Sequence, residues 1–465
     1  MVKIVKNIHN WFNDHVFRRV VINSAYLIAS NLISVFLTIY ITRLLGVYNY
    51  GVLGIITSYV TNVNKFFSFR MNEMVVRFVS EAYTKRELEK TGALIKFAAV
   101  IETGTSLFAF LFLVATAEIG SQIFLDDPSL KKYILFFGLT ILTSFAMETA
   151  NGVMRIINRY RAIALVNLVQ NVVVALLVLL AAKTGQGLEA VLFAYFFGKV
   201  ILGIVPIVLD LAWLPKFLGK GWWKVPFSLI QNKKEILRFT ISTNISSTIN
   251  LFARDGEILW VGALLSPLYA GYYKTAMTVI NMVLTPINPF IDTTYPEMMR
   301  AIAKRNGAQV RRLLSKVTVV SFSWTFAVFL GLLFFGRQLL FHEINIFKFS
   351  FQVFQTKFLP AYEIIMILMA GYGIANVFFW NRTLLLAFSK ADSATRISFI
   401  AMLLKIVGTV VLVPGSHYTT ESILLSAYLA GSVLVMTVYG LHLLRKSEQL
   451  PEISEGSEKE IISGK

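Results

Sequence analysis

Charged and amide side chains recur at helical spacing inside stretches that are otherwise apolar. Residues three and four apart share one face of an α-helix. One such face carries Lys274, Thr278, Asn281, Thr285, Asn288 and Asp292. The preceding apolar stretch carries Thr243, Ser247, Asn250, Arg254 and Glu257, with Asp255 beside them. Because Pro286 and Pro289 interrupt the first of these helices, they free backbone carbonyls that need water or polar neighbours. Each set therefore predicts a helix with one wet face.

Two stretches near the N-terminus have the same character. The first carries Asn31, Ser34, Thr38 and Thr42, and the second carries Lys65, Arg70, Asn72, Glu73 and Arg77. A charge at the middle of a bilayer costs about 2.5–3.5 kcal/mol on insertion scales, so such residues usually face a cavity or a partner. We therefore expect the four wet faces to line one aqueous cavity.

The residue types on these faces indicate the ligand. Basic side chains outnumber acidic ones, and guanidinium groups pair well with phosphate oxygens. Amides and threonines suit a ligand rich in hydroxyl groups, so an anionic, sugar-bearing substrate is predicted. The polar contacts are expected from Asn250, Asn281, Asn288 and Asn31. The candidate ion or proton sites are Asp255, Glu257, Asp292 and Glu73. With no cysteine and five scattered histidines, no metal or cofactor is expected.

Simpler explanations stand beside this one. Ser, Thr and Asn commonly form hydrogen bonds between membrane helices. Arg254 with Glu257, and Glu73 with Arg77, are candidate intrahelical ion pairs, and Arg77 also suits the inner membrane interface. Other charged residues are isolated. We expect Lys199 and Lys405 to lie near span ends and to extend their ammonium groups to the membrane surface. For Glu102 and Glu148 the sequence allows two roles, a packed polar residue or a proton site.

The elements that position these residues are membrane helices. Of 465 residues, 56% are hydrophobic and 15% charged, against about 25% charged in soluble domains. Apolar runs of the roughly 20 residues that cross a bilayer recur along the chain. We predict an all-α membrane protein with about twelve transmembrane helices. The predicted helices are 20–43, 51–79, 92–115, 133–152, 162–182, 189–213, 236–262, 269–297, 317–336, 360–388, 397–413 and 422–444.

The distribution of basic residues predicts the orientation. With the N-terminus inside, the predicted inner segments hold 28 of the 44 Lys and Arg residues, and the outer connections hold 7. Cytoplasmic loops carry such an excess, so both termini are predicted to be cytoplasmic in a multi-pass protein of the cytoplasmic membrane. The net charge of +18 then follows from topology and does not indicate nucleic acid.

An internal repeat divides the predicted helices into two sets. At an offset of 220 residues, LLGVYNYG (44–51) aligns with LLSPLYAG (264–271). The halves are expected to be pseudo-symmetric six-helix bundles around a central cavity. The wet helices, which are the first, second, seventh and eighth, are equivalent pairs under this repeat. The predicted parts are an N-terminal lobe at 1–213, an interfacial linker at 214–235, a C-terminal lobe at 236–444 and a disordered tail at 445–465.

Three segments carry a family resemblance. They are TRLLGVYNYGVLG (42–54), MVVRFVSEAY (74–83) and TYPEMMRAIAKRNGAQVRRLL (294–314). They resemble polysaccharide transporters, the O-antigen-type lipid-linked oligosaccharide flippases of the multidrug/oligosaccharidyl-lipid/polysaccharide superfamily. The resemblance implies a transporter rather than an enzyme. It would move polyprenyl-pyrophosphate-linked oligosaccharides from the inner to the outer leaflet by alternating access. Peptidoglycan-precursor flippases of this superfamily usually have fourteen helices, so twelve favour a surface-polysaccharide or glycan-lipid cargo.

The resemblance also implies roles and partners. The predicted pyrophosphate contacts are Arg254, Lys274, Arg70, Arg77 and Lys65. Motif position supports Arg77, whereas Arg254 and Lys274 rest on the wet faces alone. The expected partners are the lipid-linked substrate, membrane lipids, and glycosyltransferases or a polymerase of the same pathway, with a monomeric transport unit.

Two other functions remain open. A multidrug or cation antiporter of the same superfamily would favour an acidic cavity without the basic excess. A membrane glycosyltransferase or polymer ligase normally needs a sizeable outer loop with catalytic acids or bases. The only candidate loop is 337–359, with His342 and Glu343.

Overall fold

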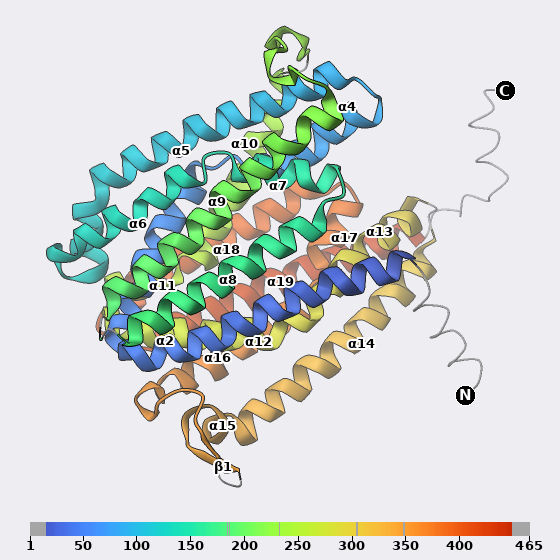
Figure 1. Ribbon diagram of the computed structural model, residues 1–465. Helices are drawn as coiled ribbons and strands as arrows, with labels where there is room; N and C mark the ends of the chain where they lie inside the picture. The colour runs from blue at the N-terminus through green and yellow to red at the C-terminus, as the bar shows by residue number, and fades with distance from the viewer. Residues whose placement is uncertain are drawn as a thin grey trace. The chain divides into compact units, whose positions relative to one another are not determined.

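The computed structural model describes residues 15–183, 185, 187–231, 233–303, 306–346 and 349–448 (Figure 1). These residues are almost entirely helical. The chain divides into two compact units, one reaching from the N-terminus to Leu251 and one from Phe252 to the C-terminus. The predicted lobes, which end at residue 213 and begin again at residue 236, are divided at another place and stay a prediction.

In the first unit, α8 packs along both α2 and α9, and α5 packs against α2 and α6. A buried apolar cluster joins α3, α5 and the start of α10 through side chains such as Met74, Ala98 and Ile236. The helices are α2 (His15–Phe67), α3 (Met71–Met74), the π-helical η1 (Val75–Val79), α4 (Ser80–Thr84), α5 (Leu88–Leu125), η2 (Pro128–Leu130), α6 (Lys131–Thr143), α7 (Met147–Ile156), α8 (Tyr160–Lys183), α9 (Leu188–Leu218), η3 (Trp222–Lys224), η4 (Phe227–Leu229) and α10 (Lys233–Asn250).

In the second unit, α16 packs against α12, α14 and α19, and α18 packs against α19. Its elements are α11 (Glu257–Leu264), α12 (Pro267–Leu284), η6 (Thr285–Ile287), α13 (Asn288–Ala303), α14 (Gly307–Gly331), the π-helical η7 (Leu332–Gly336), α15 (Arg337–Phe341), β1 (Ile344–Ile346), β2 (Phe349–Phe351), η8 (Thr356–Phe358), α16 (Ala361–Val377), α17 (Asn381–Ala387), α18 (Ala391–Leu412) and α19 (Thr420–Glu448). The π-helical η5 (Leu251–Asp255) spans the division between the units. The antiparallel pair β1 and β2, in the predicted outer connection 337–359, is the one exception to the helical fold among the described residues.

The first two predicted helices differ from the structure in how they begin and end. They are joined in α2, which is kinked at Gly46 where φ is 71° and ψ is −179°. The second was predicted to run to residue 79, and this is wrong because α2 ends at Phe67. Arg70 then adopts a left-handed conformation, with φ of 50°, before α3 begins. The polar stripe predicted over residues 65–77 is therefore divided between two helices.

Nine helices in the described ranges are long and apolar enough to cross a membrane. The chain is thus an all-helical membrane protein, and the count of twelve spans stays a prediction. Two predicted spans are missing from the nine, 236–262 and 269–297. They are the ones with the densest polar stripes, which lower their apolar character. At the C-terminus α19 continues to Glu448, and the rest of the predicted tail lies outside the described residues.

Candidate functional site

The break between α2 and α3 is held by side chains from other helices. The Ser68 hydroxyl donates to Oε1 of Glu148 on α7 over 2.9 Å. Asn244 of α10 donates to the backbone carbonyls of Phe66 and Ser68, at 3.2 and 2.5 Å. These contacts satisfy groups that the end of a helix leaves without a partner. Hydrogen bonds with α7 and α10 therefore stabilise the break between α2 and α3.

A polar cavity of about 400 Å³ lies beside this break. It is lined by α3, α7, α8 and α9 of the first unit. Its polar lining includes Arg70, Asn72, Glu73, Glu148, Arg155 and Asn167. The structure thus brings the predicted residues Arg70 and Glu73 together here, in an ion pair of 3.0 Å. The alternative pairing of Glu73 with Arg77 is not the one observed.

Two buried oxygens of this cavity lack a hydrogen-bond donor within the described part of the chain. They are Oδ1 of Asn72 and Oε2 of Glu148. Leaving a buried acceptor unsatisfied costs roughly 1–3 kcal/mol. The guanidinium of Arg155 lines the same cavity and forms no ion pair with any described residue. The cavity therefore offers both acceptors and a cationic donor to a ligand.

The Glu102 carboxylate lies beside the start of α7 and accepts three hydrogen bonds. It accepts hydrogen bonds from the backbone N–H groups of Glu148 and Thr149, at 2.8 and 2.9 Å, and from the Thr149 hydroxyl at 2.7 Å. These N–H groups belong to the first turn of α7, where the helix dipole favours a negative charge. Of the two carboxyls that the sequence left open, Glu102 is thus packed and bonded, and Glu148 faces the cavity.

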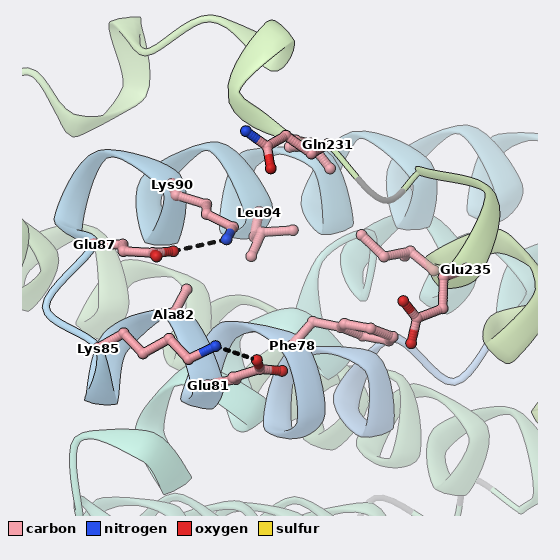
Figure 2. Close-up of a pocket in the computed structure, with 11 residues that line it drawn as sticks. Phe78, Glu81, Ala82, Lys85, Glu87, Lys90, Leu94, Gln231 and Glu235 are labelled. Carbon is pink, nitrogen blue, oxygen red and sulfur yellow. Dashed lines mark hydrogen bonds and ion pairs between the residues drawn. The ribbon is translucent and has the colours of Figure 1, made fainter.

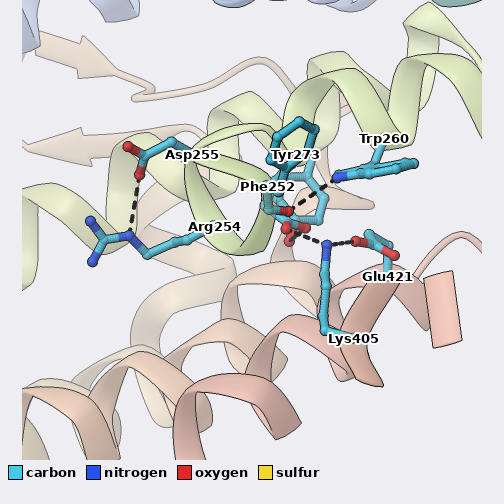
Figure 3. A network of polar contacts seen from close by, with 8 residues as sticks. Phe252, Arg254, Asp255, Trp260, Tyr273, Lys405 and Glu421 are labelled. Carbon is cyan, nitrogen blue, oxygen red and sulfur yellow. Dashed lines mark hydrogen bonds and ion pairs between the residues drawn. The ribbon is translucent and has the colours of Figure 1, made fainter. Parts of the chain in front are cut away.

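The second unit contains a buried charge cluster, which we call the lysine–glutamate cluster: Glu257, Lys405 and Glu421. The Lys405 ammonium lies 2.5 Å from Oε1 of Glu257 and forms a second ion pair with Oε1 of Glu421. Figure 3 shows this ammonium between the two carboxylates, with Trp260 and Tyr273 beside it. The side chains of Lys405, Glu257 and Glu421 are 1%, 2% and 0% exposed. The prediction that Lys405 snorkels from a span end is therefore wrong.

Arg254 has another partner than the predicted Glu257. It pairs with its neighbour Asp255, at 3.3 Å between Nε and Oδ1 (Figure 3). The helical register that placed Arg254 and Glu257 on one face is broken by the π-helical turn η5 and by the non-helical residue Gly256. Glu257 consequently turns into the cluster, whereas the Arg254 side chain stays 46% exposed.

The remaining predicted residues of the second unit lie on α12 and α13. Lys274 and Asn281 are on α12. The Thr278 hydroxyl donates to the backbone carbonyl of Lys274 at 2.9 Å, and the Thr285 hydroxyl donates to that of Asn281 at 2.6 Å. Such bonds to the preceding turn are common for threonine in helices, so these two hydroxyls are already satisfied. The side chains of Asn288 and Asp292 lie outside the described residues.

The other predicted residues of the first unit lie away from the cavity lining. Lys65 and Asn31 are exposed on α2, and Asn250 ends α10. Arg77 pairs with Glu235 at 3.6 Å, and its guanidinium lies 4.6 Å from the centre of the Phe239 ring. Arg77 thus links η1 to α10. The predicted shared cavity of all four wet faces stays a prediction.

A smaller hollow of about 210 Å³ lies between α4, the start of α5 and the segment before α10 (Figure 2). Its charges are paired: Lys85 with Glu81 and Lys90 with Glu87, both at 2.7 Å, and Glu235 with Arg77 at 3.6 Å. The hydrogen bond from Lys85 lowers the pKa of the Glu81 carboxyl. Exposed pairs of this kind contribute little to stability. They leave this hollow without a free charge that would indicate a ligand.

Comparison with known proteins gives one family and one curated relative. Residues 40–341 match the family model described as "Polysaccharide biosynthesis protein". The inner membrane protein YghQ of Escherichia coli (strain K12) is 25% identical over 300 residues, which cover 63% of this chain and 84% of YghQ.

Solved structures share the fold. An inward-facing multidrug resistance transporter of the MATE family aligns with a TM-score of 0.70 and 10% identity, over 92% of this chain and 96% of that one. The lipid II flippase MurJ, in an inward closed conformation, aligns with a TM-score of 0.66 and 14% identity, over 91% of each chain. The first of these is a member of the superfamily that the sequence segments resemble. That resemblance is confirmed at the level of the fold.

Proposed function

Because the chain belongs to the polysaccharide biosynthesis protein family, we propose that it is a flippase for polyprenyl-pyrophosphate-linked oligosaccharides. It carries the sugar-bearing headgroup from the inner to the outer leaflet of the cytoplasmic membrane by alternating access, while the lipid tail stays in the bilayer. In this proposal, twelve spans form two six-helix lobes, and both termini are cytoplasmic. The exported unit serves the synthesis of a cell-surface polysaccharide or glycan.

The cavity of the first unit carries this proposal. Its guanidinium groups, Arg70 and Arg155, suit phosphate oxygens. Its unsatisfied acceptors, Asn72 and Glu148, suit sugar hydroxyls. A sugar phosphate carries phosphate oxygens and sugar hydroxyls on neighbouring atoms. The volume of about 400 Å³ lies within the usual range for small-ligand sites, roughly 300–1,000 Å³, and suits the first sugar and its phosphate rather than a whole polymer.

The relatives support the membrane and the kind of cargo. YghQ is named as an inner membrane protein, and MurJ, which has the same fold, is named as a lipid II flippase. Arg254 and Lys274 of the second unit, with Lys65 and Arg77 of the first, are proposed as further contacts of the pyrophosphate. Glycosyltransferases and a polymerase are proposed as partners in the same pathway.

Multidrug or cation antiport is the second candidate, because a MATE multidrug transporter shares the fold. A lipophilic cation favours aromatic faces and an acidic pocket. The lining of the cavity beside α3 instead has two guanidinium groups, two carboxyl groups and three amide groups, and no aromatic side chain among its described residues. This composition favours the anionic, sugar-bearing cargo.

Surface glycan in a strain that lacks the gene tests the proposal. Wild-type protein should restore the glycan, and the double variant Arg70→Ala/Arg155→Ala should not, although it reaches the membrane in normal amount. Arg312→Ala, which removes an exposed arginine of α14, should restore the glycan fully. Unchanged glycan in the deletion strain, or full restoration by the double variant, would contradict the proposed role.

A further inference from the structure

The lysine–glutamate cluster joins three helices of the second unit. Glu257 begins α11, Lys405 lies on α18 and Glu421 lies in the first turn of α19. All three side chains are at most 2% exposed. Burial this complete removes the water that would otherwise stabilise each charge, so the charges must be compensated inside the protein.

The charges of the cluster do not cancel. Two carboxylates and one ammonium leave one negative charge in excess. Glu421 shows the same deficit in its hydrogen bonds, since its Oε2 atom is buried and has no donor among the described residues. Both carboxyl groups contact the one ammonium of Lys405, which holds the two acceptors close to each other. Two like charges on one ammonium repel each other unless one of the carboxyls carries a hydrogen.

The surrounding groups do not supply the missing positive charge. Tyr273 of α12 donates its hydroxyl to Oε2 of Glu257 at 3.3 Å, which is a neutral contact. The indole of Trp260 lies 5.8 Å from the Lys405 ammonium. Further groups that interact electrostatically with the cluster or its neighbours are Tyr372 of α16, Tyr428 of α19, Asp255 and Arg254 of η5, and Arg382 of α17. Arg254 is compensated by Asp255, and Arg382 acts on Tyr428 and not on Glu257.

We propose that the lysine–glutamate cluster is a proton-binding site, in which one proton is held between the carboxyl groups of Glu257 and Glu421. Lys405 is the fixed counter-ion of the remaining carboxylate. The proton makes the cluster neutral and gives Glu421 the hydrogen bond that it lacks. Loss of the proton leaves two carboxylates on one ammonium and weakens the contact between α11 and α19.

A proton fits the cluster better than a metal cation. The ammonium already contacts one oxygen of each carboxylate, which leaves few oxygens to coordinate a metal cation. A proton needs only one oxygen for its O–H bond and one acceptor. The described residues also contain no group of three His, Asp or Glu side chains that could hold a metal ion.

The proton site gives the proposed flippase a coupling ion, a step that rests on the proposed function. Release and rebinding of the proton would change the contacts among α11, α18 and α19. The existence of the site does not depend on the cargo, so the site and its coupling role can be tested separately.

Infrared spectroscopy tests the site on the purified full-length protein in lipid nanodiscs at neutral pH. The wild type should show carboxylic-acid C=O absorption that shifts in D₂O. Glu421→Gln and Glu257→Gln should each lose the same component of this absorption, because each leaves one carboxylate paired with Lys405. Other buried carboxyls, such as Glu102 and Asp210, contribute equally to the wild type and the variants and cancel in the difference spectrum. Two variants are used in case one fails to fold, and thermal melting checks the fold of each. Glu363→Gln, which alters a carboxylate bonded to Tyr418, should keep the band.

Two results would overturn the site. The first is a band that is the same in wild type and both variants. The second is a sodium-dependent rise in melting temperature that the wild type shows and Glu421→Gln lacks, because this would indicate a sodium site. For the coupling role, collapse of the pH gradient should stop glycan export by the wild type. Export that continues would overturn coupling while leaving both the band and the flippase function intact.

Discussion

Ser68 donates its hydroxyl hydrogen to Oε1 of Glu148 over 2.9 Å, although the two residues are 80 positions apart in the chain. The bond ties the break after α2 to the first turn of α7. It satisfies one carboxylate oxygen, whereas the other, Oε2, has no donor among the described residues, and Glu148 lines the cavity of the first unit. The same side chain thus makes a structural contact and is proposed to bind the ligand, and substitutions can separate the two roles.

Removing the Ser68 hydroxyl should lower stability. Ser68→Ala leaves Oε1 of Glu148 without this donor, and hydrogen bonds to charged groups contribute about 1.5–3 kcal/mol. We expect a loss of about 1–2 kcal/mol because backbone groups can compensate in part, measured as a lower melting temperature in detergent. Ser447→Ala removes a hydroxyl that bonds only its own helix and should leave the melting temperature unchanged. Equal melting temperatures for the two variants would refute this role of Ser68.

Glu102 and Glu148 should respond differently to the same substitution. Glu102→Gln places an amide N–H against the backbone N–H groups or the hydroxyl that now donate to Glu102. An unsatisfied buried donor costs about 1–3 kcal/mol, so its melting temperature should fall.

Glu148→Gln can keep a carbonyl oxygen toward Ser68 and turn its amide toward the cavity. It should therefore lose less stability than Glu102→Gln does, and it should lose glycan export. Melting curves and surface glycan from the same strains measure both effects. Full export by a stable Glu148→Gln protein would argue against a ligand at this carboxylate.

The sequence predicts the helices well and the contacts between them poorly. Apolar runs locate the membrane helices because the bilayer demands them. Ser68 lies in the break after α2, whereas Glu102 lies on α5 and Glu148 on α7. Lys405 lies 148 positions from Glu257. No local spacing relates residues that meet only after packing. Isolated charges such as Glu148 and Lys405 were the available signal, since a buried charge needs a partner.

Helical irregularities account for the errors in the polar stripes. A polar stripe stays on one face only where the helical period is unbroken. The π-helical turns η1 (Val75–Val79) and η5 (Leu251–Asp255) interrupt this period. Each such turn shifts the following residues around the helix axis. Glu257 thereby left the predicted face of Arg254, whereas Arg70 and Glu73, which lie before η1, stayed together. π-helical turns are frequently found at functional sites.

Lys405 should be more important for stability than an exposed lysine. Lys405→Met leaves two buried carboxylates without a cation, and breaking a buried ion pair in this way costs about 3–5 kcal/mol. The triple variant Lys405→Met/Glu257→Gln/Glu421→Gln removes all three charges and should melt well above the single variant. Lys132→Met, at a side chain 66% exposed, should change little. A single variant as stable as the triple one would contradict the charge balance described for the cluster.

Gly46 should tolerate no other residue, because its backbone is at φ 71° and ψ −179°, a region that only glycine adopts readily. Gly46→Ala should cost about 1–3 kcal/mol of strain and disturb the angle between the two parts of α2. Melting temperature and membrane-inserted amount measure the effect. Gly431→Ala is the matched control, since Gly431 lies in α19 with open space around its Cβ position. Alanine there should be neutral or stabilising by up to about 1 kcal/mol. If both variants melt like the wild type, the kink does not depend on glycine. The glycine in the segment TRLLGVYNYGVLG would then have no structural role.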